Sequence, residues 1–189
     1  MDSCSAVVEH FDGRMELVDW RRRSAALAAG REVEVLPGAH GLVFGRPVFA
    51  GPLPRRLTPP LRARDYRMDR CYSYLIEGGG WRLLDWTNVG PEGAVPADVL
   101  FVAAAASAPY YEALLAAVRP RIVIPIHWDD FFRPLSKPIR PVLKPPARRW
   151  PFLQRMDLSA FERSIGRVAP GVKVLVPEIF RTYDLAQLD

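Results

Sequence analysis

The chain has 189 residues, of which 49% are hydrophobic and 25% are charged, so it is long enough to bury the core of one globular domain. Its longest apolar run, residues 99–106, is far shorter than the ~18 residues of a membrane-spanning helix, which excludes a membrane protein. The net charge of +5 comes from one segment, because residues 131–156 contain seven Arg and Lys and no Asp or Glu.

The first third of the chain contains one predicted helix and one predicted strand. Residues 15–29 are predicted to be helical, with Gly30 as the stop signal. Residues 32–36 alternate apolar and polar side chains, which is typical of a half-buried strand. This strand ends in a Pro-Gly turn that carries His40, one of only three histidines.

A long excursion and a hairpin follow. Residues 44–70 are rich in proline and arginine and show no period, and segments of that length without secondary structure are usually functional or mobile. Residues 71–77 and 81–86 are predicted to be strands on either side of a Gly-Gly-Gly turn. This pattern predicts that the two strands form an antiparallel hairpin.

The next segment has the order strand, helix, strand. Residues 98–102 are nearly all apolar, which is typical of a strand with both faces covered. Ser107 is the expected cap of a helix over residues 110–118. Residues 121–126 form another apolar strand, which delivers His127 at its carboxyl end. This order predicts two neighbouring parallel strands joined by a crossover helix.

The C-terminal part of the chain begins with a basic, proline-rich segment, residues 133–156, which we interpret as a loop. A helix is predicted over residues 158–168 and a last strand over residues 172–176. Together the elements predict a single domain over residues 1–189, of mixed α/β (α+β) class, with a mixed sheet and outer helices.

His127 is the first candidate for a metal ligand. Ligands of open α/β sheets bind beyond the carboxyl ends of the strands, where His127, Asp129 and Asp130 stand. A neutral imidazole nitrogen binds zinc or iron, and neighbouring carboxylates ligate the ion or orient the imidazole. The alternative interpretation of this segment is an ordinary polar strand end. His40 also follows a strand, whereas His10 has no partner nearby in the sequence.

The order of these motifs resembles the C-terminal part of the metallo-β-lactamase fold family. The resemblance covers residues 32–136 and is most specific at Pro-Ile-His-Trp-Asp-Asp-Phe-Phe, a context found in a subgroup of bacterial metallo-hydrolases. It implies an αββα sandwich whose metal site lies at one edge of the two sheets. That site usually holds two zinc ions, and sometimes iron or manganese, and a metal-bound hydroxide attacks an ester, amide, thioester or phosphodiester.

The resemblance implies roles for particular residues. His127 matches the last histidine ligand of the family and His40 the histidine before the hairpin. Asn88 stands where the family has an aspartate that bridges two metals; a shift in alignment would bring Thr87 or Asp85 there instead. Because a neutral amide is a poor bridge between two cations, one tightly bound ion is expected rather than two.

The family's upstream His-x-His-x-Asp-His signature has no counterpart in this sequence, since His10 is the only histidine before His40. We therefore expect the chain to represent the second half to two thirds of the fold, either because Met1 is an internal start or because the protein is a natural remnant. A partly uncovered sheet would favour a homodimer.

Three functions follow as hypotheses. The first is a zinc-dependent hydrolase of the cytoplasm, in which Asp129 or Asp130 orients a ligand or transfers a proton. In this hypothesis Arg133 and Lys137 attract a small anionic substrate. The second is a non-catalytic binding or dimerisation module. The third, which we favour least, is nucleic-acid binding through the basic segment, because its prolines keep the charges off one helical face.

Overall fold

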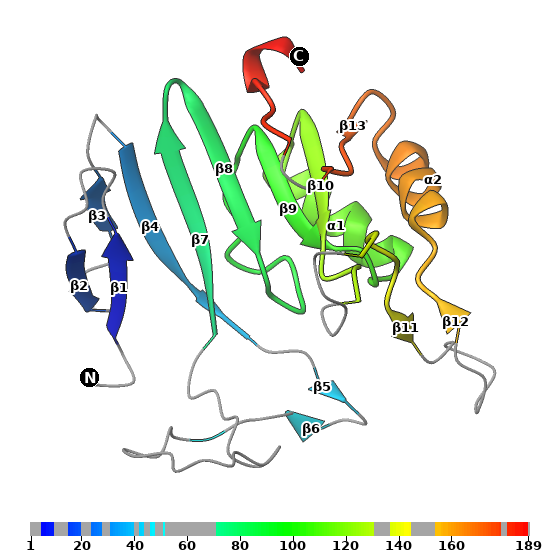
Figure 1. Ribbon diagram of the computed structural model, residues 1–189, viewed down its shortest axis with the longest axis horizontal. Coiled ribbons are helices and arrows are strands. Elements are labelled where there is room, and N and C mark those ends of the chain that lie inside the picture. The colour runs from blue at the N-terminus through cyan, green and yellow to red at the C-terminus, as the bar shows by residue number, and fades with distance from the viewer. Residues whose placement is uncertain are drawn as a thin grey trace. The chain divides into compact units, whose positions relative to one another are not determined.

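A computed structural model describes most of the second half of the chain and the strands of the first half. The described residues are 5–9, 15–19, 24–27, 31–39, 42–43, 46–47, 51, 71–130, 137–144, 154–178 and 181–188. The chain divides into two compact units, Met1–Gly93 and Ala94–Asp189, and both are drawn in Figure 1. None of the described helices is long and apolar enough to cross a bilayer.

The described part of the first unit consists of strands. They are β1 (Ser5–Glu9), β2 (Met15–Asp19), β3 (Ser24–Leu27), β4 (Arg31–Gly38), β5 (Leu42–Val43), β6 (Arg46–Pro47), β7 (Cys71–Gly78) and β8 (Trp81–Trp86). Strands β3, β4, β7 and β8 form consecutive antiparallel pairs, while β1 pairs with β2 and β5 with β6. The predicted strand at residues 32–36 and the predicted hairpin are confirmed as β4 and as β7 with β8.

The β7–β8 hairpin is built around a tight glycine turn. Gly79 and Gly80 have φ angles of 62° and 81°, values that side chains other than glycine rarely tolerate. Leu75 and Leu84 lie directly opposite each other in the pair and are buried at 2% and 0% exposure. Trp86 ends β8 and is also buried. The hairpin therefore supplies much of the described core of this unit.

The predicted helix over residues 15–29 is wrong, because this segment contains the strands β2 and β3. Leu17 pairs with Val7 of β1, and Ala25 pairs with Val33 of β4. Each pairing joins two consecutive strands of the chain, and the pairing of strands overrides weak local helix preference.

The described part of the second unit has three parallel strands and two α-helices. Its elements are β9 (Val99–Ala103), α1 (Ala108–Val118), β10 (Ile122–Ile126), β11 (Leu143–Lys144), β12 (Gln154–Arg155), α2 (Leu158–Val168), β13 (Lys173–Val174) and η2 (Leu185–Gln187). Strand β10 is parallel to both β9 and β13, and β11 pairs with β12 in antiparallel fashion. The predicted strand–helix–strand order is confirmed, as is the helix over 158–168. The last strand is shorter than predicted.

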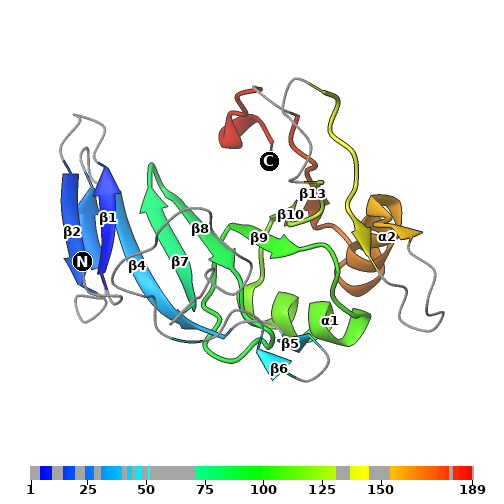
Figure 2. The same cartoon turned by 60° about the horizontal axis from the view of Figure 1, so that its bottom comes forward.

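The two helices contact each other through aromatic rings. The rings of Tyr111 in α1 and Phe161 in α2 meet edge to face, with centroids 5.4 Å apart. In Figure 2 the two helices lie close together beside β9 and β10. Asp157 caps α2 by accepting a hydrogen bond from the Ala160 N–H at 3.0 Å. Ser107 occupies the expected cap position of α1, but its side chain makes no capping hydrogen bond.

Candidate functional site

His127 lies at the carboxyl end of the parallel pair, as the sequence predicts. The last residues of β10 and β9 are neighbours: Ile126 pairs with Ala103, and its carbonyl accepts a hydrogen bond from the Ala104 N–H at 3.2 Å. His127 follows directly, with an exposed side chain and a φ of 54°. A positive φ is uncommon for any residue except glycine, and such conformations concentrate at functional sites.

The chain after His127 is held by a short antiparallel ribbon. The Trp128 carbonyl accepts a hydrogen bond from the Val142 N–H at 2.8 Å, and the Asp130 N–H donates to the Arg140 carbonyl at 2.9 Å. Between them, Asp129 and Pro141 form a bridge. These hydrogen bonds fix the backbone of the residues that follow His127. The backbone is therefore hydrogen-bonded on both sides of this residue.

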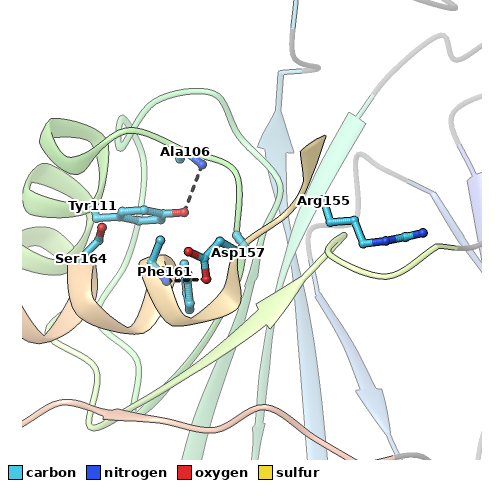
Figure 3. A pocket seen from close by; sticks show the side chains of 8 residues that line it. Ala106, Tyr111, Arg155, Asp157, Phe161 and Ser164 are labelled. Atoms are coloured by element: carbon cyan, nitrogen blue, oxygen red, sulfur yellow. Dashed lines mark hydrogen bonds between the residues drawn. The ribbon is translucent and has the colours of Figure 1, made fainter. Parts of the chain in front are cut away.

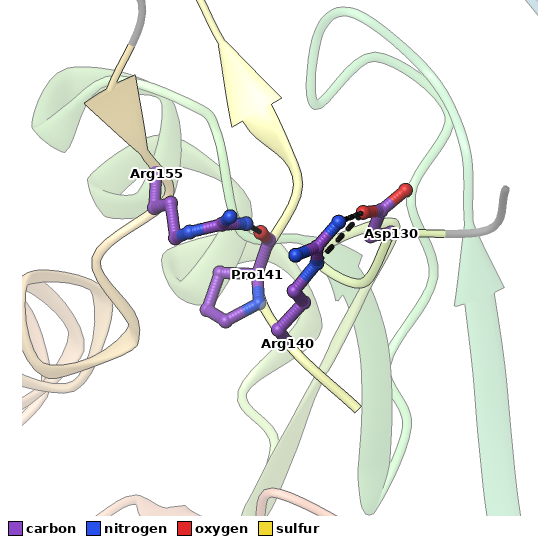
Figure 4. A network of polar contacts seen from close by, with 4 residues as sticks. All are labelled: Asp130, Arg140, Pro141 and Arg155. Carbon is purple, nitrogen blue, oxygen red and sulfur yellow. Dashed lines mark hydrogen bonds and ion pairs between the residues drawn. The ribbon is translucent and has the colours of Figure 1, made fainter. Parts of the chain in front are cut away.

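Asp130 also uses its carboxylate within this ribbon. The Nε and the Nη2 of Arg140 both lie 3.0 Å from Asp130 Oδ2, as Figure 4 shows. Arg155 of β12 donates a hydrogen bond to the carbonyl of Pro141 at 2.8 Å. Arg140 and Arg155 of the basic segment therefore make specific contacts with this ribbon while their side chains remain exposed.

The first unit places Asn88 just beyond the end of β8. Its Nδ2 donates a hydrogen bond to the carbonyl of Pro37 at 3.1 Å, and its Oδ1 accepts one from the Ala39 N–H. Both partners belong to the end of β4 and the residue that follows it. The resemblance predicts Asn88 as a metal ligand, yet both ends of its amide contact the protein backbone.

The other predicted site residues are described only in part. His40 and Arg133 lie outside the described residues, and Lys137 is exposed. Among the residues that the structure describes, no three His, Cys, Asp or Glu side chains gather in a group that could hold a metal. The described donors, with His127 as their one imidazole, thus do not complete a zinc site by themselves, because such sites need at least three protein ligands.

Sequence reasoning missed a cavity of about 470 Å³ in the second unit. Figure 3 draws the residues that line it and labels Ala106, Tyr111, Arg155, Asp157, Phe161 and Ser164. Its lining combines residues 104–111 with residues 155–164, which no local sequence pattern relates. The cavity starts just after β9, at the same edge of the parallel pair that carries His127.

The hydroxyl of Tyr111 is fixed beside this cavity. It donates a hydrogen bond to the Ala103 carbonyl at 2.9 Å and accepts one from the Ala106 N–H at 3.0 Å. Burial raises the pKa of this phenol to about 12, so it stays protonated at neutral pH. The hydroxyl of Tyr111 therefore ties α1 to the residues that follow β9.

A comparison of the chain with protein-family models and with curated proteins found no match in either set.

Proposed function

We propose that this chain adopts part of an αββα metallo-β-lactamase sandwich and belongs to a metal-dependent hydrolase, with His127 as a metal ligand. The observation that carries the proposal is the exposed imidazole at the carboxyl end of the β9–α1–β10 unit, on a backbone with a positive φ. The mixed sheet strands and the two helices agree with such a fold at a coarse level.

The resemblance in sequence adds His40 as a second ligand and zinc, one or two ions, as the metal, with iron or manganese as alternatives. A bound zinc ion would supply a Lewis acid and a hydroxide nucleophile. The exposed ammonium of Lys137, ten residues after His127, favours a small anionic substrate.

A non-catalytic scaffold is the second candidate. One observation favours it: the amide of Asn88, which the resemblance predicts as a metal ligand, is bonded to backbone. In this case the fold would serve as a binding or dimerising module. The two candidates differ in one measurable property, the affinity of the chain for zinc.

The test is a zinc titration of the purified chain, followed by metal analysis. We expect about one zinc ion per chain, and we expect His127→Asn to weaken binding by at least about tenfold. Asparagine tolerates a positive φ, so this variant removes the imidazole and keeps the backbone. His10→Gln is the matched control, because the sequence predicts no ligand role for His10, which lies outside the described residues.

The outcomes separate the two candidates. Loss of zinc binding in His127→Asn but not in His10→Gln supports the hydrolase proposal. Equal zinc affinity in wild type and His127→Asn, or no zinc binding in wild type, contradicts it and favours the scaffold.

A further inference from the structure

The end of β8 and the end of β4 lie at the same edge of the sheet in the first unit. Strand β7 is antiparallel to both of its neighbours, so β4 and β8 run in the same direction on either side of it. Thr87 ties the end of β8 to β7: its hydroxyl donates to the Tyr72 carbonyl at 2.9 Å, and its N–H donates to the Ser73 hydroxyl at 3.1 Å. Asn88 is the next residue, and its side chain reaches the end of β4.

The amide of Asn88 matches the two backbone groups that it meets. A carbonyl at Pro37 needs a donor, and an N–H at Ala39 needs an acceptor. Asparagine offers both on one planar group, whereas aspartate at neutral pH offers acceptors only. A carboxylate here would lose the bond to Pro37 and place negative charge against its carbonyl oxygen.

We propose that Asn88 is a positioning residue, not a metal ligand: it clamps the end of β4 through Pro37 and Ala39 and so sets the point from which the chain continues into His40. The clamp itself rests on the two hydrogen bonds. Its consequence for a metal site rests on the proposed function, because only there does His40 act as a ligand.

The packing of Gly38 supports the clamp. This residue lies between the two clamped positions and pairs with Cys71 of β7. A Cβ atom added to Gly38 would lie 2.7 Å from the Cys71 carbonyl oxygen, so the end of β4 lies close against β7 with no room for a side chain. Two contacts thus hold this end of β4, one from β7 and one from Asn88.

The first experiment measures amide hydrogen exchange by NMR in the metal-free protein. We expect the Ala39 amide to exchange about two- to tenfold faster in Asn88→Ala than in wild type, which is the effect of losing one hydrogen bond. Asn88→Asp keeps an acceptor and should fall between the two. The matched control is Val89→Ala, which changes an exposed side chain next to the clamp and should leave the Ala39 amide unchanged.

A global loss of stability is distinguished within the same spectra. The amides of Leu75 and Leu84 lie in the β7–β8 pair and report on the sheet as a whole. Faster exchange at Ala39 with unchanged exchange at these two amides supports the clamp. Equal exchange at Ala39 in Asn88→Ala and in wild type overturns it.

The second experiment is a zinc titration of Asn88→Asp, followed through the imidazole nitrogen shifts of His40. If Asn88 were a ligand, a carboxylate in its place would bind zinc more tightly, so a gain in affinity overturns the proposal. The clamp predicts equal or weaker binding. Faster exchange at Ala39 in a chain that binds no zinc supports the clamp and contradicts the proposed hydrolase, so the two ideas can fail separately.

Discussion

The hydroxyl of Tyr111 should make the free energy of unfolding vary with pH in the alkaline range. Burial raises its pKa to about 12, above the ordinary value of about 10. The folded state therefore favours the protonated phenol, and this stabilisation is complete below about pH 10 and is lost as the pH rises towards 12. We expect the free energy of unfolding to fall over that interval, as measured by denaturant titrations at several pH values.

The variant Tyr111→Phe isolates this effect. It should cost about 1–3 kcal/mol at neutral pH, because the Ala103 carbonyl and the Ala106 N–H lose their partner. The free energy of unfolding of this variant should fall less steeply between about pH 10 and 12 than that of wild type. Burial and the charge of Asp85 also raise the pKa of Tyr74, so some decline remains in both proteins. Parallel curves for the two proteins would contradict the assignment.

At the scale of elements, two glycines should respond oppositely to substitution by alanine. Gly38→Ala forces a Cβ against the backbone of Cys71 and should cost about 1–3 kcal/mol of unfolding free energy. Gly166 lies on the exposed side of α2, and a methyl group there would meet open space, so Gly166→Ala should stabilise by about 0.5–1 kcal/mol. Chemical denaturation measures both, and a destabilised Gly166→Ala would contradict this account.

Elements with a clear local pattern could be predicted, whereas a strand that depends on its pairing partner could not. The apolar run of β10 and the helical pattern of α2 each lie within a short stretch of sequence, and both predicted elements are confirmed. Strand β2 is different, because its alternation is short and only its pairing with β1 makes it a strand.

The candidate site also contains one feature that the sequence could predict and one that it could not. The position of His127 follows from the strand before it and could be predicted. The hydrogen bonds of Asn88 to Pro37 and Ala39 join residues 51 and 49 positions apart, so no local sequence pattern could predict them. The resemblance to a family even pointed to a different role for this residue.

At the scale of the whole molecule, the uneven charge leads to a prediction about nucleic acids. Arg140 of the basic segment is paired with the carboxylate of Asp130, which offsets one of its positive charges. We expect a generic DNA duplex to bind no tighter than about 10⁻⁵ M at physiological salt, and binding to weaken as salt rises. Fluorescence anisotropy at several salt concentrations measures this. A dissociation constant below about 10⁻⁷ M would instead favour nucleic-acid binding as the function.

The turn at Gly79 and Gly80 governs more than the hairpin that it closes. Successive strand residues face opposite sides of a sheet, so lengthening or shortening this loop by one residue would rotate every later position of β8 to the other face. Asn88 would then no longer meet the end of β4. The two glycines at the other end of the hairpin therefore determine whether Asn88 can form its hydrogen bonds with Pro37 and Ala39.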